Sequence, residues 1–382
     1  MGFFNFDFYE IIIWIATALL CLIAAGCRRI PLRAQGGIGQ PLPNPIAVIL
    51  PIIFFTIVTA LRKNIGDTFF YQYSFELLPD SGNPVSFSVF VDSMFAFFQN
   101  IIRNMTDDPQ WLVAFTGIFA TPIPLFILYK YSNPFEMSIY LFVAFGYLGG
   151  IMNGVRQYMA AAITLCATRY LFSLKRGSFI KYTIIVLIAY CMHSSALILI
   201  PLYFVFRRKA WQLSSYMMIL GSIVLVLVFD AVLPSFMSAL ESTAYSGYSS
   251  NGWFTNGQES GTNLFRSLTA VAPIFVAYTN RDRMKLLGHI GDVLTNIAFV
   301  NAAICIVSLY NWIFVRLTIY LSIYYIIFTV WVVNYAVKPR QKSAYVIVTI
   351  LLFFIYSRNL SYMIANYESD YFFPNRKLFK GR

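Results

Sequence analysis

Charged residues are scarce in this sequence. Asp, Glu, Lys and Arg make up 12% of its 382 residues, about half of the roughly 25% that is usual in soluble domains. Hydrophobic residues make up 59% of the chain, and the mean hydropathy is +0.67. This composition excludes an ordinary soluble enzyme and indicates an all-α, polytopic integral membrane protein.

Cysteine and histidine are also rare. The five cysteines lie within apolar runs or at their ends and form no C-x-x-C pair, so they indicate neither a disulfide framework nor a zinc site. Asp107-Asp108 and Glu368-Ser369-Asp370 have no spacing specific for a metal, and we interpret them as solvated loops. We therefore expect chemistry without a metal or another cofactor.

The net charge of +12 would suggest a nucleic-acid partner in a soluble chain. The sequence has no basic arm or stacking platform of the kind that nucleic-acid binders carry. Most of its cations lie in short loops between apolar runs, where Lys and Arg mark the cytoplasmic side of a membrane protein. We therefore expect membrane lipid, and no nucleic acid, around this protein.

Apolar runs predict about 10–12 transmembrane helices, because each approaches the 17–25 residues that a spanning helix needs. They cover residues 9–27, 46–61, 111–129, 135–151, 155–172, 180–206, 211–233, 263–278, 294–309, 312–337 and 344–356. The basic loops can all be cytoplasmic only if residues 180–206 turn back near 191–195. We predict a broken helix there, forming a hairpin with His193 at its outer tip.

The sequence has no internal repeat and no separate soluble domain. We predict a single integral membrane domain over residues 1–382. Two outer segments, 62–110 and 234–262, are long enough to fold over a site.

Several cations remain on the outer side in this topology. An arginine near the bilayer centre costs about 2.5–3.5 kcal/mol on insertion scales, so such a group indicates a function. The stretch 62–71 combines cations, a carboxylate and aromatic rings after an apolar run, and Gly66 permits a sharp turn. We predict that Arg62, Asp67 and Tyr71 line a site for an anionic, lipid-borne substrate.

Arg156 follows a glycine-rich connection and starts a helix. Free N–H groups at a helix N-terminus together with a guanidinium favour phosphate binding. The alternative is an interfacial arginine that snorkels to water.

Arg316 is expected one turn inside its helix, with Tyr320 on the same face. The alternative for Arg316 is a buried pair with a carboxylate, for which Asp67 is the main candidate. Arg266 is a weaker candidate on the same side. His193 can act in catalysis or cap the returning half-helix.

Four motifs resemble the EpsG family of bacterial Wzy-like polymerases of exopolysaccharide, capsule and O-antigen. They are Arg62…Ile65-Gly66-Asp67-Thr68…Tyr71, Asn153-Gly154-Val155-Arg156-Gln157-Tyr158-Met159-Ala160, His193-Ser194-Ser195-Ala196-Leu197-Ile198 and Arg316-Leu317-Thr318-Ile319-Tyr320. The resemblance implies an architecture like that of the multi-helix glycosyltransferases of the C type. It also implies a multi-pass protein of the bacterial cytoplasmic membrane.

By the same resemblance, the protein polymerises oligosaccharide repeat units at the outer face of that membrane. Donor and acceptor are both carried on undecaprenyl diphosphate, and a flippase and a chain-length regulator are expected partners. Two alternatives stay open. A flippase for the same lipid predicts a central cavity and inverted repeats, and the sequence has no repeat. The second alternative is a ligase of the same fold, which the sequence does not distinguish from a polymerase.

The chemistry of this transfer fits the arginines. A glycosidase needs a carboxyl pair to protonate its leaving group, whereas diphosphate leaves as a stable anion and needs positive charge nearby. In this scheme Arg62, Arg156 and Arg316 hold the diphosphate. His193 or Asp67 takes the acceptor proton, with His193 favoured. The resemblance adds further substrate-binding residues, and the predicted set is Tyr71, Asn153, Gln157, Tyr320 and Arg266.

Overall fold

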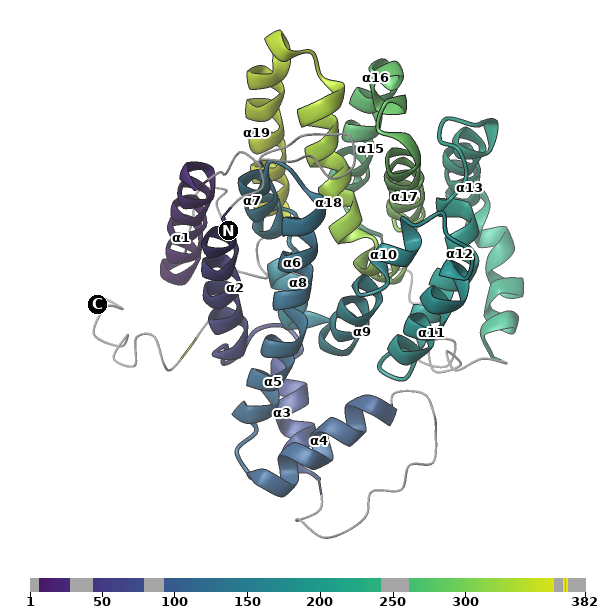
Figure 1. Ribbon diagram of the computed structural model, residues 1–382. Coiled ribbons are helices and arrows are strands. Elements are labelled where there is room, and N and C mark those ends of the chain that lie inside the picture. Colours follow the sequence, from purple (N-terminus) through teal and green to yellow (C-terminus); the bar gives the residue numbers. More distant parts are fainter. Residues whose placement is uncertain are drawn as a thin grey trace. The chain divides into compact units, whose positions relative to one another are not determined.

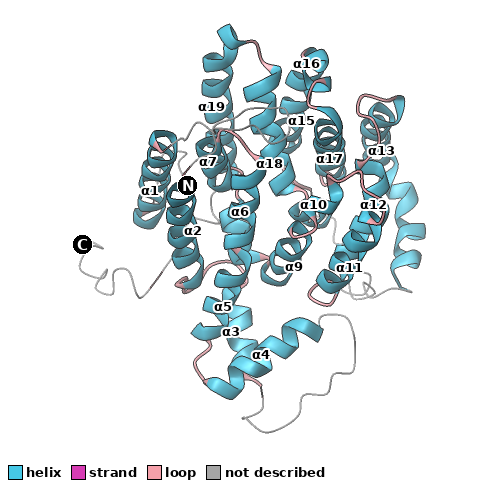
Figure 2. Ribbon diagram, viewed as in Figure 1, coloured by secondary structure: helices cyan, strands magenta, loops and turns pink. Residues whose placement is uncertain are grey.

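The computed structural model describes residues 7–27, 44–78, 93–241, 261–360, 367 and 369. This part of the chain is helical and contains no strand (Figure 2). Four helices in it are long and apolar enough to span a membrane, or up to six if each of two bent helix pairs is one span. Further apolar helices of 10–17 residues coincide with other predicted runs. The all-α, polytopic class is thus confirmed, while the count of 10–12 helices and the C-type likeness stay predictions.

Contacts divide the chain into two compact units. Unit 1 consists of Met1–Thr168, Lys181–Ala196 and Phe353–Arg382, and unit 2 of Arg169–Ile180 and Leu197–Leu352. The single membrane domain over 1–382 stays a prediction. The predicted outer segments lie partly outside the described residues, which omit 79–92 and 242–260.

Unit 1 is built around α2, which packs against α1, α5 and α6 (Figure 1). Its helices are α1 (Phe8–Gly26), α2 (Pro45–Ala60), α3 (Thr68–Glu76), α4 (Ser93–Met105), α5 (Gln110–Ala120), α6 (Pro122–Tyr131), α7 (Phe135–Ala144), α8 (Tyr147–Asn153), α9 (Val155–Leu165) and most of α11 (Ser178–Tyr190). A buried ion pair joins the start of α1 to the end of α19 (Lys342–Leu360), with Arg358 Nη1 2.5 Å from Glu10 Oε1. This pairing gives Arg358 a structural role.

The predicted run 135–151 is bent. Helices α7 and α8 meet at an angle of 47°, because Gly146 between them has a φ of 82°, a left-handed conformation that favours glycine. Helix α8 then ends at Asn153, and α9 begins two residues later, after Gly154. The tight connection predicted from the glycines is therefore present.

Unit 2 is centred on α17, which packs against α13, α15 and α18. Its helices are α12 (Leu199–Phe206), α13 (Leu213–Glu241), α15 (Leu264–Thr279), α16 (Arg281–Lys285), α17 (Gly288–Val307), η2 (Trp312–Tyr320), α18 (Ser322–Trp331), η3 (Val332–Ala336), η4 (Pro339–Gln341) and the first half of α19; α10 (Thr168–Leu171) begins at its boundary.

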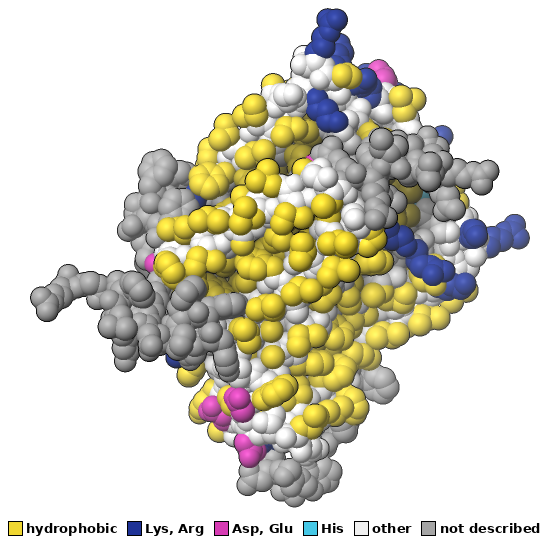
Figure 3. Space-filling view, turned by 60° about the vertical axis from the view of Figure 1, so that its left-hand side comes forward, with side chains coloured by type: hydrophobic (Ala, Val, Ile, Leu, Met, Phe, Trp, Pro, Cys, Tyr) yellow, Lys and Arg dark blue, Asp and Glu magenta, His cyan; other side chains and the backbone are white. Residues whose placement is uncertain are grey.

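On the face that Figure 3 presents, hydrophobic side chains cover most of the described surface. Such a surface suits contact with lipid.

The predicted hairpin is present. Helix α11 ends at Tyr190, and a 3₁₀ helix, η1 (Ser194–Ile198), leads into α12. The ring of Phe179, at the start of α11, lies 5.2 Å from that of Tyr203 in α12. Just after α12, Arg207 Nη1 donates to the carbonyl of Leu171 at 2.8 Å. The end of α12 therefore lies beside the start of α11, as a hairpin requires.

Basic loops of unit 2 gather at one end of the unit. Arg207 reaches Leu171 as described, Arg283 Nη1 donates to the carbonyl of Val337 at 2.8 Å, and the rings of Trp211 and Tyr278 lie 5.9 Å apart. This gathering agrees with the alternation that the charges predict. The assignment of that end to the cytoplasm stays a prediction.

Candidate active site

The turn between α2 and α3 lies directly against the end of α8. Gly66 has a φ of 55°, and a Cβ built on it would lie only 2.7 Å from the Cα of Asn153. A side chain at this position would therefore meet backbone that has no room to move. Glycine lets the turn bring Asp67, the N-cap residue of α3, beside the start of α9.

Arg156 joins α9 to α3. It is the second residue of α9 and is half-buried, and its guanidinium hydrogen-bonds the Tyr71 side chain. The guanidinium carbon also lies 6.0 Å from the ring centroid of Phe95 in α4, and the Tyr71 and Phe95 rings meet edge to face at 5.4 Å. Arg156 is thus held between two aromatic rings from two other helices.

The Tyr71 hydroxyl is a hydrogen-bond donor at neutral pH. Burial raises the pKa of this group, and the nearby charge of Asp67 adds to the rise, while Arg156 opposes it. The raised pKa keeps the proton on the phenol, so the site presents a hydroxyl next to a guanidinium.

His193 is fixed by its own turn and by α9. The backbone N–H of Ser195 points at His193 Nδ1 (3.3 Å), and the Ser195 hydroxyl lies 2.8 Å from the same nitrogen. Gln157 Nε2 donates to that hydroxyl at 3.2 Å, which leaves the hydroxyl proton for Nδ1. This network assigns Nδ1 as an acceptor and the ring proton to Nε2.

Helix α4 closes the arrangement. The backbone N–H of Met94, at its start, donates to the carbonyl of Cys191 at 3.1 Å, where the hairpin breaks. Unit 1 thus brings together the turn before α3, the α8–α9 connection and the hairpin break. The sequence-predicted residues that meet here are Asp67, Tyr71, Asn153, Arg156, Gln157 and His193, and their roles stay predictions.

Two residues of this site were not predicted. Phe95 lies in a stretch with an amphipathic pattern, but such a pattern does not identify one ring among several. The sequence indicates Ser195 only as a member of the His193 motif, whereas in the structure its hydroxyl links Gln157 to His193.

Arg62 is buried beside this site, with 1% of its surface exposed. Its donors reach the hydroxyls of Thr68 (2.9 Å) and Thr116 (3.0 Å) and the carbonyls of Thr59 (2.5 Å) and Val113 (3.5 Å). These oxygens come from α2, α3 and α5, so the guanidinium ties three helices together. This geometry favours a structural role over direct contact with a diphosphate.

The remaining predicted residues belong to unit 2. Arg266 lies in the first turn of α15, and Thr262, just before that helix, donates its backbone N–H to the carbonyl of Ser308 at 2.8 Å. Arg316 follows in η2, with its guanidinium carbon 5.0 Å from the ring centroid of Trp312. Arg266 and Arg316 thus lie at the end of unit 2 opposite the basic loops.

The helix that carries Arg316 differs from the prediction. Trp312–Tyr320 is a 3₁₀ helix and meets the following helix at 70°. A 3₁₀ helix has three residues per turn, so Arg316 and the buried Tyr320 are about a third of a turn apart around its axis. The expected shared face is therefore wrong. A 3₁₀ stretch of nine residues is unusually long and is typical of a functional hinge or a strained segment.

These observations define the class of protein: an all-helical, polytopic membrane protein in which an arginine, a tyrosine, a carboxylate and an imidazole meet at helix ends. The chain belongs to the EpsG family, whose family model matches residues 46–374. EpsG is a Wzy-like polysaccharide polymerase family, and the matched range includes all four motifs. No curated protein and no solved structure matches the chain.

Proposed function

We propose that this protein polymerises oligosaccharide repeat units carried on undecaprenyl diphosphate into exopolysaccharide or capsule. The transfer takes place at the outer face of the bacterial cytoplasmic membrane. Family membership supports a polymerase, and one observation supports the donor. Arg156, at a helix N-terminus, is braced by Tyr71 and Phe95, and the next residue, Gln157, contacts the His193 motif through Ser195. A helix start with a guanidinium suits a diphosphate.

The proposed step is a displacement at the anomeric carbon of the donor sugar. The acceptor hydroxyl oxygen forms the new bond, the bond from carbon to diphosphate breaks, and its electron pair leaves on the diphosphate. The Arg156 guanidinium and the positive end of the α9 helix dipole stabilise that developing charge. The Tyr71 hydroxyl holds the guanidinium in place.

Asp67 takes the proton of the acceptor hydroxyl in this proposal. A base needs a free lone pair, and the only one on neutral His193 is at Nδ1, which accepts from Ser195. In this proposal His193 therefore contributes an N–H donor at Nε2 toward substrate, in place of the base role that the sequence favoured. Asn153 positions the turn that contains Gly66, and Gln157 positions the His193 imidazole through Ser195.

The other arginines have separate roles. Arg62 holds α2, α3 and α5 in register and so places Asp67. In unit 2, Arg316 stays a predicted diphosphate-binding residue, and Arg266 and Tyr320 stay predicted substrate-binding residues. Because guanidinium groups supply the positive charge, the reaction needs no metal or other cofactor. A flippase and a chain-length regulator act with the protein in the cell.

The test is elongation in proteoliposomes. Lipid-linked repeat units are added from outside, and product length is read on gels. The proposal expects long products with the wild type and with Arg169→Ala, an exposed arginine stacked on Tyr170 at 4.7 Å. With Arg156→Ala, lengthening should be about 10²- to 10³-fold slower. Transbilayer movement of the lipid without elongation would identify a flippase. Single transfer to an unrelated acceptor would identify a ligase.

A further inference from the structure

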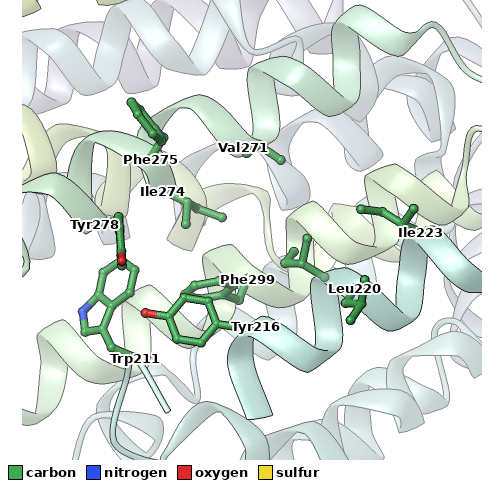
Figure 4. A pocket seen from close by; sticks show the side chains of 10 residues that line it. Trp211, Tyr216, Leu220, Ile223, Val271, Ile274, Phe275, Tyr278 and Phe299 are labelled. Atoms are coloured by element: carbon green, nitrogen blue, oxygen red, sulfur yellow. The ribbon is translucent and has the colours of Figure 1, made fainter. Parts of the chain in front are cut away.

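A groove of about 360 Å³ lies in unit 2 between α13, α15 and α17 (Figure 4). Its walls are aliphatic and aromatic side chains. Leu220 and Phe275 on its rim are 53% and 65% exposed, so they face the surroundings of the protein. The volume falls near the lower end of the roughly 300–1,000 Å³ range of small-molecule pockets.

The groove has two unlike ends. Trp211, Tyr216 and Tyr278 gather at one end, with ring centroids 5.9 Å apart for Trp211 and Tyr278 and 6.2 Å for Tyr216 and Tyr278. Leu220 and Ile223 lie at the other end (Figure 4). Tyr and Trp prefer the boundary between hydrocarbon and water. The aromatic end therefore marks the interface, and the aliphatic end points into the bilayer.

One cation contacts the aromatic end, and two more precede it closely in the sequence. The Arg281 guanidinium carbon lies 5.3 Å from the Tyr278 ring centroid, and Arg281 is exposed. Arg208 and Lys209, which are also exposed, lie three and two residues before Trp211 in the chain. The neighbouring carboxylate of Asp282 is engaged by Lys285 Nζ at 3.0 Å. Positive charge here is thus available to a ligand.

The loop before α13 is held in shape. Asn296 Nδ2 donates to the carbonyl of Arg208 at 2.7 Å, and the Asp292 carboxylate accepts from the backbone N–H of Ala210 at 3.0 Å. Trp211 has a φ of 64°, which is unusual for a bulky residue and marks a constrained site. The loop therefore fixes the Trp211 ring at the mouth of the groove.

We propose that this groove binds an anionic phospholipid, with one acyl chain along the groove and the phosphate at Arg281. Charge complementarity selects the headgroup, because the basic loops of unit 2 belong to the predicted cytoplasmic side, whose leaflet is negatively charged. The site is independent of the proposed polymerase reaction.

The experiment uses the full-length protein in nanodiscs containing phosphatidylglycerol or phosphatidylcholine with brominated acyl chains, which quench tryptophan fluorescence. The chain has six tryptophans, so the difference between wild type and Trp211→Phe isolates the Trp211 signal. We expect that signal to be quenched more strongly by brominated phosphatidylglycerol. Arg281→Gln should reduce the preference about fivefold, the effect of one interfacial cation.

Two variants complete the test. Arg340→Gln, which removes an exposed cation of another loop, should keep the preference for phosphatidylglycerol. Val271→Phe, which fills the groove, should abolish quenching of the Trp211 signal. Equal quenching by both lipids, or quenching unchanged by Val271→Phe, would overturn the proposal. Displacement of brominated phosphatidylglycerol by a tenfold lower concentration of polyprenyl phosphate would assign the groove to the carrier lipid instead.

Discussion

Gly66 packs against Asn153 so closely that a Cβ on Gly66 would lie 2.7 Å from the Asn153 Cα. This contact fixes the turn before α3 against the connection between α8 and α9. It links the Asp67 and Arg156 motifs in addition to the hydrogen bond between Arg156 and Tyr71.

Gly66→Ala is expected to reduce elongation roughly 10- to 100-fold, because a shift of about 1 Å in a catalytic group has effects of that order. The measurement is the rate of lengthening in proteoliposomes. Gly177→Ala is the matched control: Gly177 also has a positive φ, 78°, but nothing lies within 4 Å of its built Cβ. An equal loss in both variants would show that backbone strain alone, and not the contact with Asn153, matters.

The role of His193 is tested by His193→Gln, whose amide N–H can replace the Nε2 donor. Loss of one hydrogen bond to a charged group costs about 1.5–3 kcal/mol, so His193→Ala should lose roughly 10- to 100-fold in rate. His193→Gln should recover most of that loss, and its pH–rate profile should keep the wild-type shape. If both variants were equally inactive, at the roughly 10²- to 10⁴-fold typical of a lost general base, His193 would be the base.

Arg156 is expected to stabilise the leaving diphosphate. Removing one such donor typically costs about 10²- to 10³-fold in rate, so Arg156→Ala should lose that much. Arg156→Lys should be intermediate, because lysine keeps the charge but not the planar fork. Tyr71→Phe should lose roughly 10- to 100-fold, because a hydrogen bond to a charged group such as the Arg156 guanidinium contributes about 1.5–3 kcal/mol. Full activity of Arg156→Lys would mean that the positive charge at position 156 is sufficient and that the planar fork of the guanidinium is not needed.

The hairpin and the gathering of the unit 1 motifs could be predicted from the sequence. The hairpin followed from the positions of Arg207 to Lys209, since a single crossing at 180–206 would put every later basic cluster on the wrong side. The meeting of the Gly66 and Asn153 motifs followed because both carry charged groups, Arg62, Asp67 and Arg156, that the predicted topology leaves on the outer side.

Other features could not be predicted, for physical reasons. A cation in an outer loop looks the same in sequence whether it binds a ligand or protein oxygens, and the oxygens around Arg62 come partly from Val113 and Thr116, some 50 residues away. Over nine residues, the apolar pattern around Arg316 does not separate a period of 3.0 from one of 3.6. The 3₁₀ form was therefore missed.

Arg62→Met is expected to lower stability rather than act on chemistry alone. It leaves buried oxygens without donors, at about 1–3 kcal/mol each, so the midpoint of thermal unfolding in detergent should fall together with activity. Lys63→Met, at the exposed neighbouring position, should change the midpoint little. If Arg62→Met lost elongation while its unfolding midpoint stayed unchanged, Arg62 would bind the diphosphate directly, as the sequence predicts.

The sidedness of the hairpin is tested by single cysteines in a variant whose five native cysteines are replaced by alanine. Met105 is 80% exposed at the end of α4, the helix whose start is bonded to the hairpin break, so Met105→Cys should react with an impermeant maleimide in intact spheroplasts. Arg208→Cys should react only after permeabilisation, because its basic loop follows the positive-inside rule. Labelling of Arg208→Cys in intact cells would show that the basic end of unit 2 is outside. The opposite end of unit 2, which carries Arg316, would then face the cytoplasm.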